Sequence, residues 1–186
     1  MRISSGEFSG TSIFSPKGMN ARPTMAKARQ AIFNMLRPVL PGSTIIDFFA
    51  GTGALGFEAL SNGAANVVFV ENKYTGIIHR NAAKLKIESG AYAVIKSDYR
   101  KAFGFFEKNG ARADFIFADP PYNKGIVKNF LKMLGKSDIL CKHGMAVVES
   151  HIKEADEISD LPGLETEKKR KYGDTLIIML KRRPDL

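Results

Sequence analysis

The sequence predicts an α/β fold in which a mostly parallel sheet is covered by helices on both faces. From residue 43 onward, short apolar segments alternate with segments of helical periodicity, a pattern typical of parallel strands buried on both faces. A glycine-rich loop follows the first of these strands, as in Rossmann-like folds. The last segment, Glu165–Lys181, instead has two extended runs on either side of Tyr172-Gly173-Asp174, which predicts a C-terminal antiparallel hairpin.

The first 42 residues have a different pattern. Residues 2–14 contain isolated apolar side chains between Ser-Gly pairs, which indicates a short β-hairpin or loop. Arg22-Pro23-Thr24 ends this segment, and Thr24 is a candidate N-cap for an amphipathic helix that ends near Pro38. We therefore expect an N-terminal extension, residues 1–42, followed by a single catalytic domain, residues 43–186.

Within that domain the expected strands and helices alternate in order. The expected strands are Thr44–Phe49, Asn66–Val70, Ala91–Lys96, Ala113–Ala118 and Met145–Glu149. The expected helices are Ala54–Asn62, Thr75–Glu88, Tyr99–Lys108 and Ile126–Leu134.

Length and composition restrict the class of protein. The 186 residues are 44% hydrophobic, enough for one packed core but not for a disordered chain. No apolar run approaches the roughly 18 residues that span a bilayer, and no signal peptide is visible. The single cysteine, Cys141, excludes an intrachain disulfide and fits a reducing compartment. We expect a soluble, cytoplasmic protein.

The positive charge is concentrated at the two ends of the chain. The formal net charge is +9; residues 1–43 contain six Lys or Arg and one acid, and residues 165–186 contain seven and four. This distribution favours contact with a polyanion. The alternative for Lys168-Lys169-Arg170-Lys171 is a solvated strand edge, since lysines protect edge strands from aggregation.

The glycine loop contains the first functional motif. Glycines at 51, 53 and 56 fit the dinucleotide spacing G-x-G-x-x-G, and Glu71 follows at the end of the next strand. However, Asp47 lies at the end of the preceding strand, where its negative charge would face a pyrophosphate. An NAD-dependent oxidoreductase is therefore the weakest of the functions considered.

An acid before the loop favours a cofactor that carries a cation. S-adenosylmethionine has an ammonium group for Asp47 to receive and no phosphate. Gly51 and Gly53 would let the backbone approach the cofactor closely, and Glu71 could accept hydrogen bonds from both ribose hydroxyls. Asp98 could accept from the adenine amino group, with a helix N-cap as the alternative role. Phe49 and Tyr99 are candidates for the walls of the cofactor pocket, with core packing as the alternative.

The second motif, Asp119-Pro120-Pro121-Tyr122, follows the fourth expected strand. Two prolines make this loop rigid, so that it presents the Asp119 carboxylate, a proline carbonyl and an aromatic ring together. These groups can receive the two N–H bonds of an exocyclic base amino group and orient its lone pair towards a sulfonium methyl. Tyr122 would stack on the base.

Together these motifs resemble those of S-adenosylmethionine-dependent amino-group methyltransferases. The ends of the chain narrow the resemblance to the bacterial small-subunit ribosomal RNA guanine-N2 methyltransferases, the RsmD-like family. The segments that carry it are Arg2-Ile3-Ser4-Ser5-Gly6, Arg22-Pro23-Thr24, Phe33-Asn34-Met35-Leu36, Phe49–Leu60 and Lys171-Tyr172-Gly173-Asp174-Thr175.

The resemblance implies methylation of a guanine N2 in 16S ribosomal RNA, on an assembled or assembling subunit. Orientation and electrostatics suffice for this transfer, so we expect no metal, and we expect a monomer. It implies that Gly51, Gly53 and Glu71 hold the cofactor and that Asp119–Tyr122 hold the base. Arg22 and Thr24 would reach either the cofactor carboxylate or an RNA phosphate. Lys168–Lys171 are the other candidate RNA contacts.

Two further functions fit the same residues. A DNA adenine-N6 or cytosine-N4 methyltransferase would use the same Asp-Pro-Pro-Tyr chemistry, although the chain leaves little room for a target-recognition region. A non-catalytic RNA-binding scaffold would keep the fold without methyl transfer. A metal site at Cys141, His143 and His151 is not expected, because no fourth ligand lies at a zinc spacing.

Overall fold

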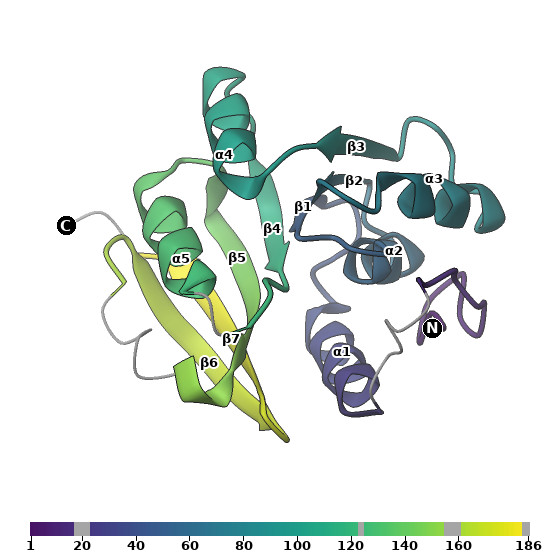
Figure 1. Ribbon diagram of the computed structural model, residues 1–186, viewed down its shortest axis with the longest axis horizontal. Helices are drawn as coiled ribbons and strands as arrows, with labels where there is room; N and C mark the ends of the chain where they lie inside the picture. Colours follow the sequence, from purple (N-terminus) through teal and green to yellow (C-terminus); the bar gives the residue numbers. More distant parts are fainter. Residues whose placement is uncertain (17–22, 123–124, 155–160, 184–186) are drawn as a thin grey trace.

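Seven strands form a single sheet in the computed structural model, which describes residues 1–16, 23–122, 125–154 and 161–183. Their order is β3-β2-β1-β4-β5-β7-β6 (Figure 1). The first five are parallel, and β7 is antiparallel to β5 and to β6. The strands are β1 (Thr44–Phe48), β2 (Asn66–Glu71), β3 (Tyr92–Lys96), β4 (Ala113–Ala118), β5 (Leu140–His151), β6 (Leu164–Tyr172) and β7 (Thr175–Arg182). The predicted parallel sheet with a terminal antiparallel hairpin is confirmed.

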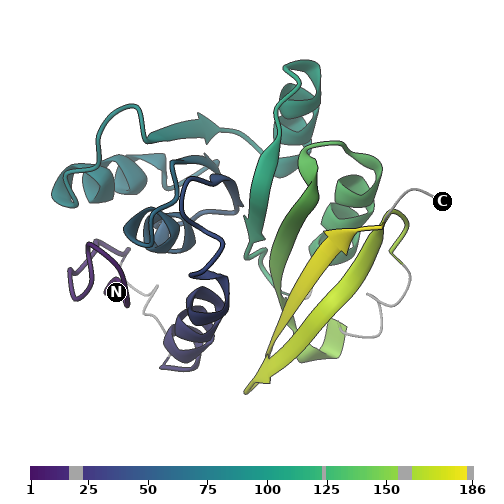
Figure 2. The same cartoon turned by 180° about the vertical axis from the view of Figure 1, so that it is seen from behind.

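Helices cover both faces of the sheet, as Figure 2 also shows from behind. The helices are α1 (Pro23–Leu36), α2 (Ala54–Ser61), α3 (Thr75–Lys84), α4 (Tyr99–Lys108) and α5 (Ile126–Lys136). The first three pack on one face and the last two on the other. Alternation along β1 serves both faces: Ile45 packs with α1 and α2, whereas Phe48 stacks on Phe103 of α4 and meets Phe130 of α5 edge-on.

The strand order reverses between β1 and β4. From β1 the chain continues outward to β2 and β3, and it then returns to place β4 on the other side of β1. The carboxyl ends of the parallel strands share one edge of the sheet. In open α/β sheets, ligands bind outside this edge at the point of reversal, and both sequence motifs lie there.

Most predicted boundaries lie within two residues of those observed, and three of the differences have a clear physical reason. The helix α1 begins at Pro23, so the prediction of Thr24 as its N-cap is wrong; proline suits the first helical position because no N–H bond is needed there. The helix α3 ends at Lys84, since Lys86 adopts a left-handed φ of 56°. The strand β5 begins five residues earlier than predicted, at Leu140, because a register irregularity after its pairing with Ala113 conceals the alternation.

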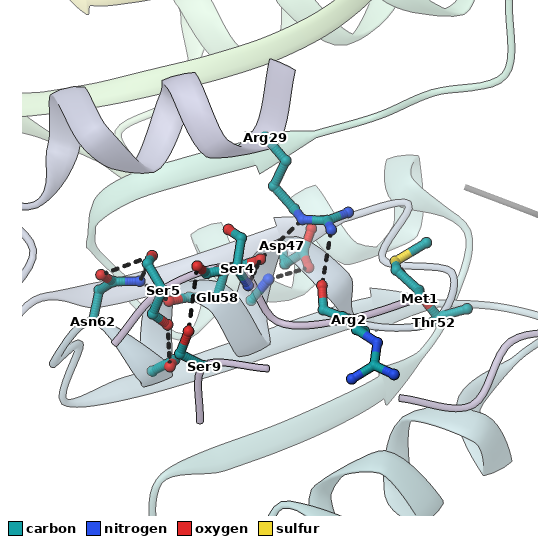
Figure 3. A network of polar contacts seen from close by, with 12 residues as sticks. Met1, Arg2, Ser4, Ser5, Ser9, Arg29, Asp47, Thr52, Glu58 and Asn62 are labelled. Carbon is teal, nitrogen blue, oxygen red and sulfur yellow. Dashed lines mark hydrogen bonds and ion pairs between the residues drawn. The ribbon is translucent and has the colours of Figure 1, made fainter. Parts of the chain in front are cut away.

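The N-terminal residues pack against the rest of the fold through a buried polar network (Figure 3). The Arg29 Nε donates to Glu58 Oε1 over 3.0 Å, and the backbone N–H of Ser4 donates to the same oxygen over 2.7 Å. Arg29 Nη2 also donates to the Arg2 carbonyl. Ile3 and other N-terminal apolar residues share one hydrophobic cluster with α2 and the sheet. The extension is therefore part of the same core.

A second buried contact joins this extension to the glycine loop. The Asn81 side chain on α3 is fully buried. Its Oδ1 accepts from the Phe14 backbone, and its Nδ2 donates to the carbonyl oxygens of Phe14 and Thr52. The loop position thus depends on the docked N-terminal residues.

Candidate active site

A cavity of about 680 Å³ opens at the carboxyl edge of the sheet. This volume lies within the roughly 300–1,000 Å³ of small-molecule and cofactor sites. Its lining comes from the ends of the parallel strands and from the turn between β6 and β7. The predicted residues among them are Phe49, Gly51, Glu71, Asp98, Tyr99 and Asp119–Tyr122. The two sequence motifs therefore meet in one cavity.

The three glycines of the loop have different structural roles. Gly51 has φ 55° and faces the cavity, where an added Cβ would have only the Phe49 carbonyl oxygen near it, 3.9 Å away. At Gly53, with φ 81°, a Cβ would lie 2.5 Å from the Phe57 ring, and at Gly56 one would lie 2.3 Å from the Phe69 ring. Gly53 and Gly56 are therefore required by helix–strand packing, and neither lines the cavity.

Phe49 turns the chain out of β1 with a left-handed φ of 57°. Such a backbone conformation is strained for a bulky residue and is concentrated at functional sites. The Phe49 ring packs on Tyr99 at 5.0 Å between centroids and on Phe130 at 5.8 Å. Phe49 thus joins the cavity wall to the aromatic core beneath α4 and α5.

Glu71 is held rigidly at the end of β2. Its Oε2 accepts from the Gly51 N–H over 2.8 Å, and its Oε1 accepts from the N–H groups of Lys73 (2.8 Å) and Tyr74 (3.3 Å). A carboxylate has about four lone-pair sites, and these three N–H groups occupy both sites on Oε1 and one on Oε2. Oε2 is thus pre-organised to receive a ligand hydroxyl group.

Asp47 lies beneath the loop and does not line the cavity. Its carboxyl is 1% exposed, and Oδ2 accepts from the Gly56 N–H over 3.0 Å. Burial raises the pKa of Asp47 to about 8, an effect that the Gly56 hydrogen bond opposes and that Asp119 and Glu71 reinforce. The carboxyl of Asp47 therefore fixes the first turn of α2. The glycine loop would lie between this carboxyl and a cation bound in the cavity.

Asp98 and Tyr99 begin α4 at the far end of the cavity. Asp98 caps the helix, because Oδ1 accepts from the Arg100 N–H over 2.9 Å; the alternative of a helix cap is confirmed. Its cavity-lining position leaves Oδ2 able to accept as well. The Tyr99 hydroxyl is buried and has no hydrogen-bond partner among the described residues. Unused acceptor and donor groups of this kind fit an adenosine-containing cofactor.

Asp119-Pro120-Pro121-Tyr122 lines the opposite half of the cavity. Burial raises the pKa of Asp119 to about 6. The carboxyl is therefore ionised at neutral pH, but it becomes neutral when the pH falls through about 6. The Tyr122 hydroxyl lies 3.3 Å from Thr175 Oγ1, and its ring meets the His151 ring edge-on at 5.6 Å. The ends of β5 and β7 therefore hold the aromatic ring in place.

Two residues of this site were not assigned to it from the sequence. Glu149 on β5 is 4% exposed, and its Oε2 has no hydrogen-bond partner within the described residues. Burial and the nearby Asp119 raise its pKa well above the ordinary value, against the opposing effect of Arg29. His151 lines the cavity, although the sequence analysis considered it only as a metal ligand. Alternation along β5 places both on the α1 face, but only the sheet order shows that they adjoin Asp119.

The predicted RNA-binding residues lie outside the cavity. Lys169, Arg170 and Lys171 are exposed on the edge strand β6, which runs into the cavity-lining turn at Gly173 and Asp174; Lys168 is partly buried there. Arg22 and the side chain of Thr24 lie outside the described residues.

The part of the chain that the structure describes contains neither a cluster of metal ligands nor a membrane-spanning helix. No group of three or more His, Cys, Asp or Glu side chains there could hold a metal ion. Cys141 and His143 lie near the start of β5, whereas His151 is at its other end. No helix in those ranges is long and apolar enough to cross a bilayer.

The fold and the site are those of a Rossmann-like methyltransferase. The features that define this class are the strand order, the glycine loop that donates to Glu71, and the Asp-Pro-Pro-Tyr corner. The chain belongs to the family described as Conserved hypothetical protein 95, which matches residues 1–181. It is 32% identical to YlbH of Bacillus subtilis, a proposed rRNA methyltransferase, over 98% of this chain and 100% of YlbH.

Similarity to Escherichia coli is found both in sequence and in structure. Ribosomal RNA small subunit methyltransferase D is 32% identical over 82% of this chain and 76% of its own length. The solved structure of yhhF, a proposed methyltransferase, superposes with a TM-score of 0.83 at 28% identity, covering 100% of this chain and 99% of yhhF.

Proposed function

We propose that this protein is an S-adenosylmethionine-dependent methyltransferase that acts on the exocyclic N2 of a guanine in small-subunit (16S) ribosomal RNA. One observation carries the proposal: a single cavity contains both the Glu71 carboxylate, held by backbone N–H groups, and the Asp119-Pro120-Pro121-Tyr122 corner. A cofactor and a flipped base could meet there. The substrate class follows the name of the 32% identical relative, a small-subunit ribosomal RNA methyltransferase.

Glu71, Asp98 and Gly51 are the proposed cofactor contacts. Glu71 would accept from a ribose hydroxyl through Oε2, Asp98 Oδ2 would accept from the adenine amino group, and the Gly51 backbone would lie against the cofactor. Phe49 and Tyr99 would pack on the adenine. Asp47 would be reached through the loop that also contains Gly53. The ammonium charge would lower the pKa of Asp47 from about 8 and so favour the ionised carboxylate that balances it. S-adenosylmethionine supplies a methyl group made electrophilic by its sulfonium.

Asp119 and the Pro120 carbonyl would receive the target amino group. Two hydrogen bonds from that nitrogen would hold its lone pair out of the ring and direct it towards the methyl group. Ionised Asp119 would also stabilise the positive charge that develops on the nitrogen as the N–C bond forms and the sulfonium S–C bond breaks. The nitrogen would then lose one of its two protons, and the thioether form of the cofactor would leave. Tyr122, fixed by Thr175 and His151, would stack on the base.

The basic residues at the two ends would bind the RNA. Lys168, Lys169, Arg170 and Lys171 would contact phosphates beside the cavity mouth, and Arg22 and Thr24 would contact either a phosphate or the cofactor carboxylate. We propose that the enzyme works in the cytoplasm as a monomer without a metal, on ribosomal RNA in an assembled or assembling subunit.

The decisive test is methyl transfer from labelled S-adenosylmethionine to three acceptors prepared from cells that lack the enzyme. These acceptors are small ribosomal subunits, deproteinised ribosomal RNA and genomic DNA, each digested to nucleosides after reaction. Label in N2-methylguanosine is the expected result, and the preferred acceptor identifies whether ribosomal proteins help to form the target.

The other outcomes would replace the proposal. Label in N6-methyladenine or N4-methylcytosine from DNA would retain the chemistry but change the substrate. Cofactor binding without label in any acceptor would identify an RNA-binding scaffold. An acceptor-independent preference for NAD in a competition titration would exclude methyl transfer altogether.

A further inference from the structure

His151 and Thr175 form one wall of the cavity beside the Asp-Pro-Pro-Tyr corner. They are cross-strand partners in the antiparallel pairing of β5 with β7, and both line the cavity. Their contacts with Tyr122 described above hold the tyrosine ring between them. Packing against Tyr122 would explain the position of the His151 ring. It would not explain why the two ring nitrogens differ in their hydrogen bonds.

The hydrogen bond of one His151 nitrogen fixes the role of the other. The backbone N–H of Lys153 donates to His151 Nδ1 over 3.1 Å. Since a backbone N–H can only donate, Nδ1 is an acceptor, and the neutral ring carries its proton on Nε2. Nε2 has no hydrogen-bond partner among the described residues. The cavity wall therefore presents one oriented donor.

The sheet register places this donor close to Asp119. Ala118 pairs with Val148, so Asp119 comes level with Glu149 on the neighbouring strand. His151 is two residues farther along β5 on the same face, about 7 Å from Glu149 along the strand. A base whose amino group is held by Asp119 would extend its adjoining ring atoms towards this position.

We propose that His151 binds the target base, its Nε2–H donating to the ring nitrogen next to the exocyclic amino group. In guanine, adenine and cytosine the carbon that carries the amino group is bonded to a ring nitrogen with a free lone pair. Asp119 accepts from the amino group and His151 donates to its neighbour, so together they recognise a donor beside an acceptor. This inference rests on the proposed function and adds a substrate-binding residue to it.

Two substitutions separate the donor from the ring. His151→Phe keeps an aromatic edge against Tyr122 but removes the donor. His151→Gln loses the ring but can place an amide N–H near the position of Nε2. The kcat and KM of each variant are measured with small ribosomal subunits as acceptor, together with the Kd for S-adenosylmethionine and the melting temperature.

The donor role predicts a specific pattern across these measurements. His151→Phe lowers kcat/KM at least tenfold while the cofactor Kd changes less than twofold, and His151→Gln retains activity within about threefold of the wild type. An active His151→Phe, or a loss confined to His151→Gln, would overturn the inference and assign His151 to packing alone. No methyl transfer by the wild type would instead reject the proposed function, and the base contact with it.

Discussion

Arg29 and Glu58 form an ion pair, 3.0 Å between Nε and Oε1, whose side chains are 8% and 0% exposed. Arg29 lies on α1 and Glu58 on α2, so the pair joins the N-terminal extension to the helix that follows the glycine loop. The same Arg29 charge attracts the buried Glu149 at the active site. The Arg29 guanidinium thus helps to hold α1 against α2 and also favours the ionised form of Glu149.

Arg29→Met should destabilise the protein by about 3–5 kcal/mol, because it leaves the Glu58 carboxyl buried without its counter-charge. The double variant Arg29→Met/Glu58→Met should regain much of this loss, since it removes both charges. Urea unfolding of the two single variants and the double variant measures the coupling. Additive effects would show that the pair contributes nothing beyond packing.

The loop glycines provide a matched pair of substitutions. Gly53→Ala should cost about 2–4 kcal/mol of stability, because it combines a left-handed φ with a Cβ 2.5 Å from the Phe57 ring. Gly51→Ala should cost only about 1–2 kcal/mol, the strain of its φ, but should weaken cofactor binding because its Cβ enters the cavity. Thermal unfolding and cofactor titration separate the two effects. Equal stability losses would contradict the packing role given to Gly53.

Asp47 makes stability depend on pH. Its folded pKa of about 8 exceeds the ordinary 3.8, so between these values the unfolded chain holds fewer protons and stability falls as pH rises. Asp47→Asn should unfold less readily than the wild type, by a margin that widens from pH 5 to pH 8 by up to about 1.4 kcal/mol per pH unit. Unfolding free energies across this range check the slope. A margin independent of pH would mean that Asp47 is ionised in the folded protein.

How far the sequence predicted the site depended on how local each feature was. Asp119-Pro120-Pro121-Tyr122 and the glycine loop are continuous segments, and their positions follow from the ends of apolar strands. Glu149 and His151 reach the same site only through the pairing of β5 with β4 and β7, which periodicity cannot reveal. Arg29 and Glu58 likewise lie 29 positions apart in the sequence, on two different helices. The N-cap was misplaced because Pro23 and Thr24 both carry helix-start signals, and only the backbone distinguishes them.

Asp119 should give methyl transfer an acidic limb. Burial raises its pKa to about 6, so activity should fall as the pH drops through about 6 and the carboxyl becomes neutral. Asp119→Ala should reduce kcat by about 10²–10³ at neutral pH, as loss of one oriented transition-state contact does, with little change in cofactor affinity. Asp119→Asn keeps an acceptor oxygen and should be less impaired, without the inflection near pH 6. An unchanged inflection in Asp119→Asn would assign it to another group, of which Glu149 is the buried neighbour.

RNA binding should weaken steeply with salt, because neutralised phosphates release counterions. For single strands the slope of log Kd against log salt is about 0.7 per phosphate contact. Replacing Lys169, Arg170 and Lys171 together with Gln should therefore reduce the slope by up to about 2. The matched control replaces three other cations with Gln, namely Lys101, Lys108 and Lys132, which are exposed on α4 and α5. It should leave the slope unchanged. Lys169, Arg170 and Lys171 do not line the cavity. In the variant that lacks them, kcat at saturating RNA should therefore stay near the wild-type value while KM rises. If the two sets of variants reduce the slope equally, the positive charge of β6 acts only through the net charge, and the RNA binds elsewhere on the molecule.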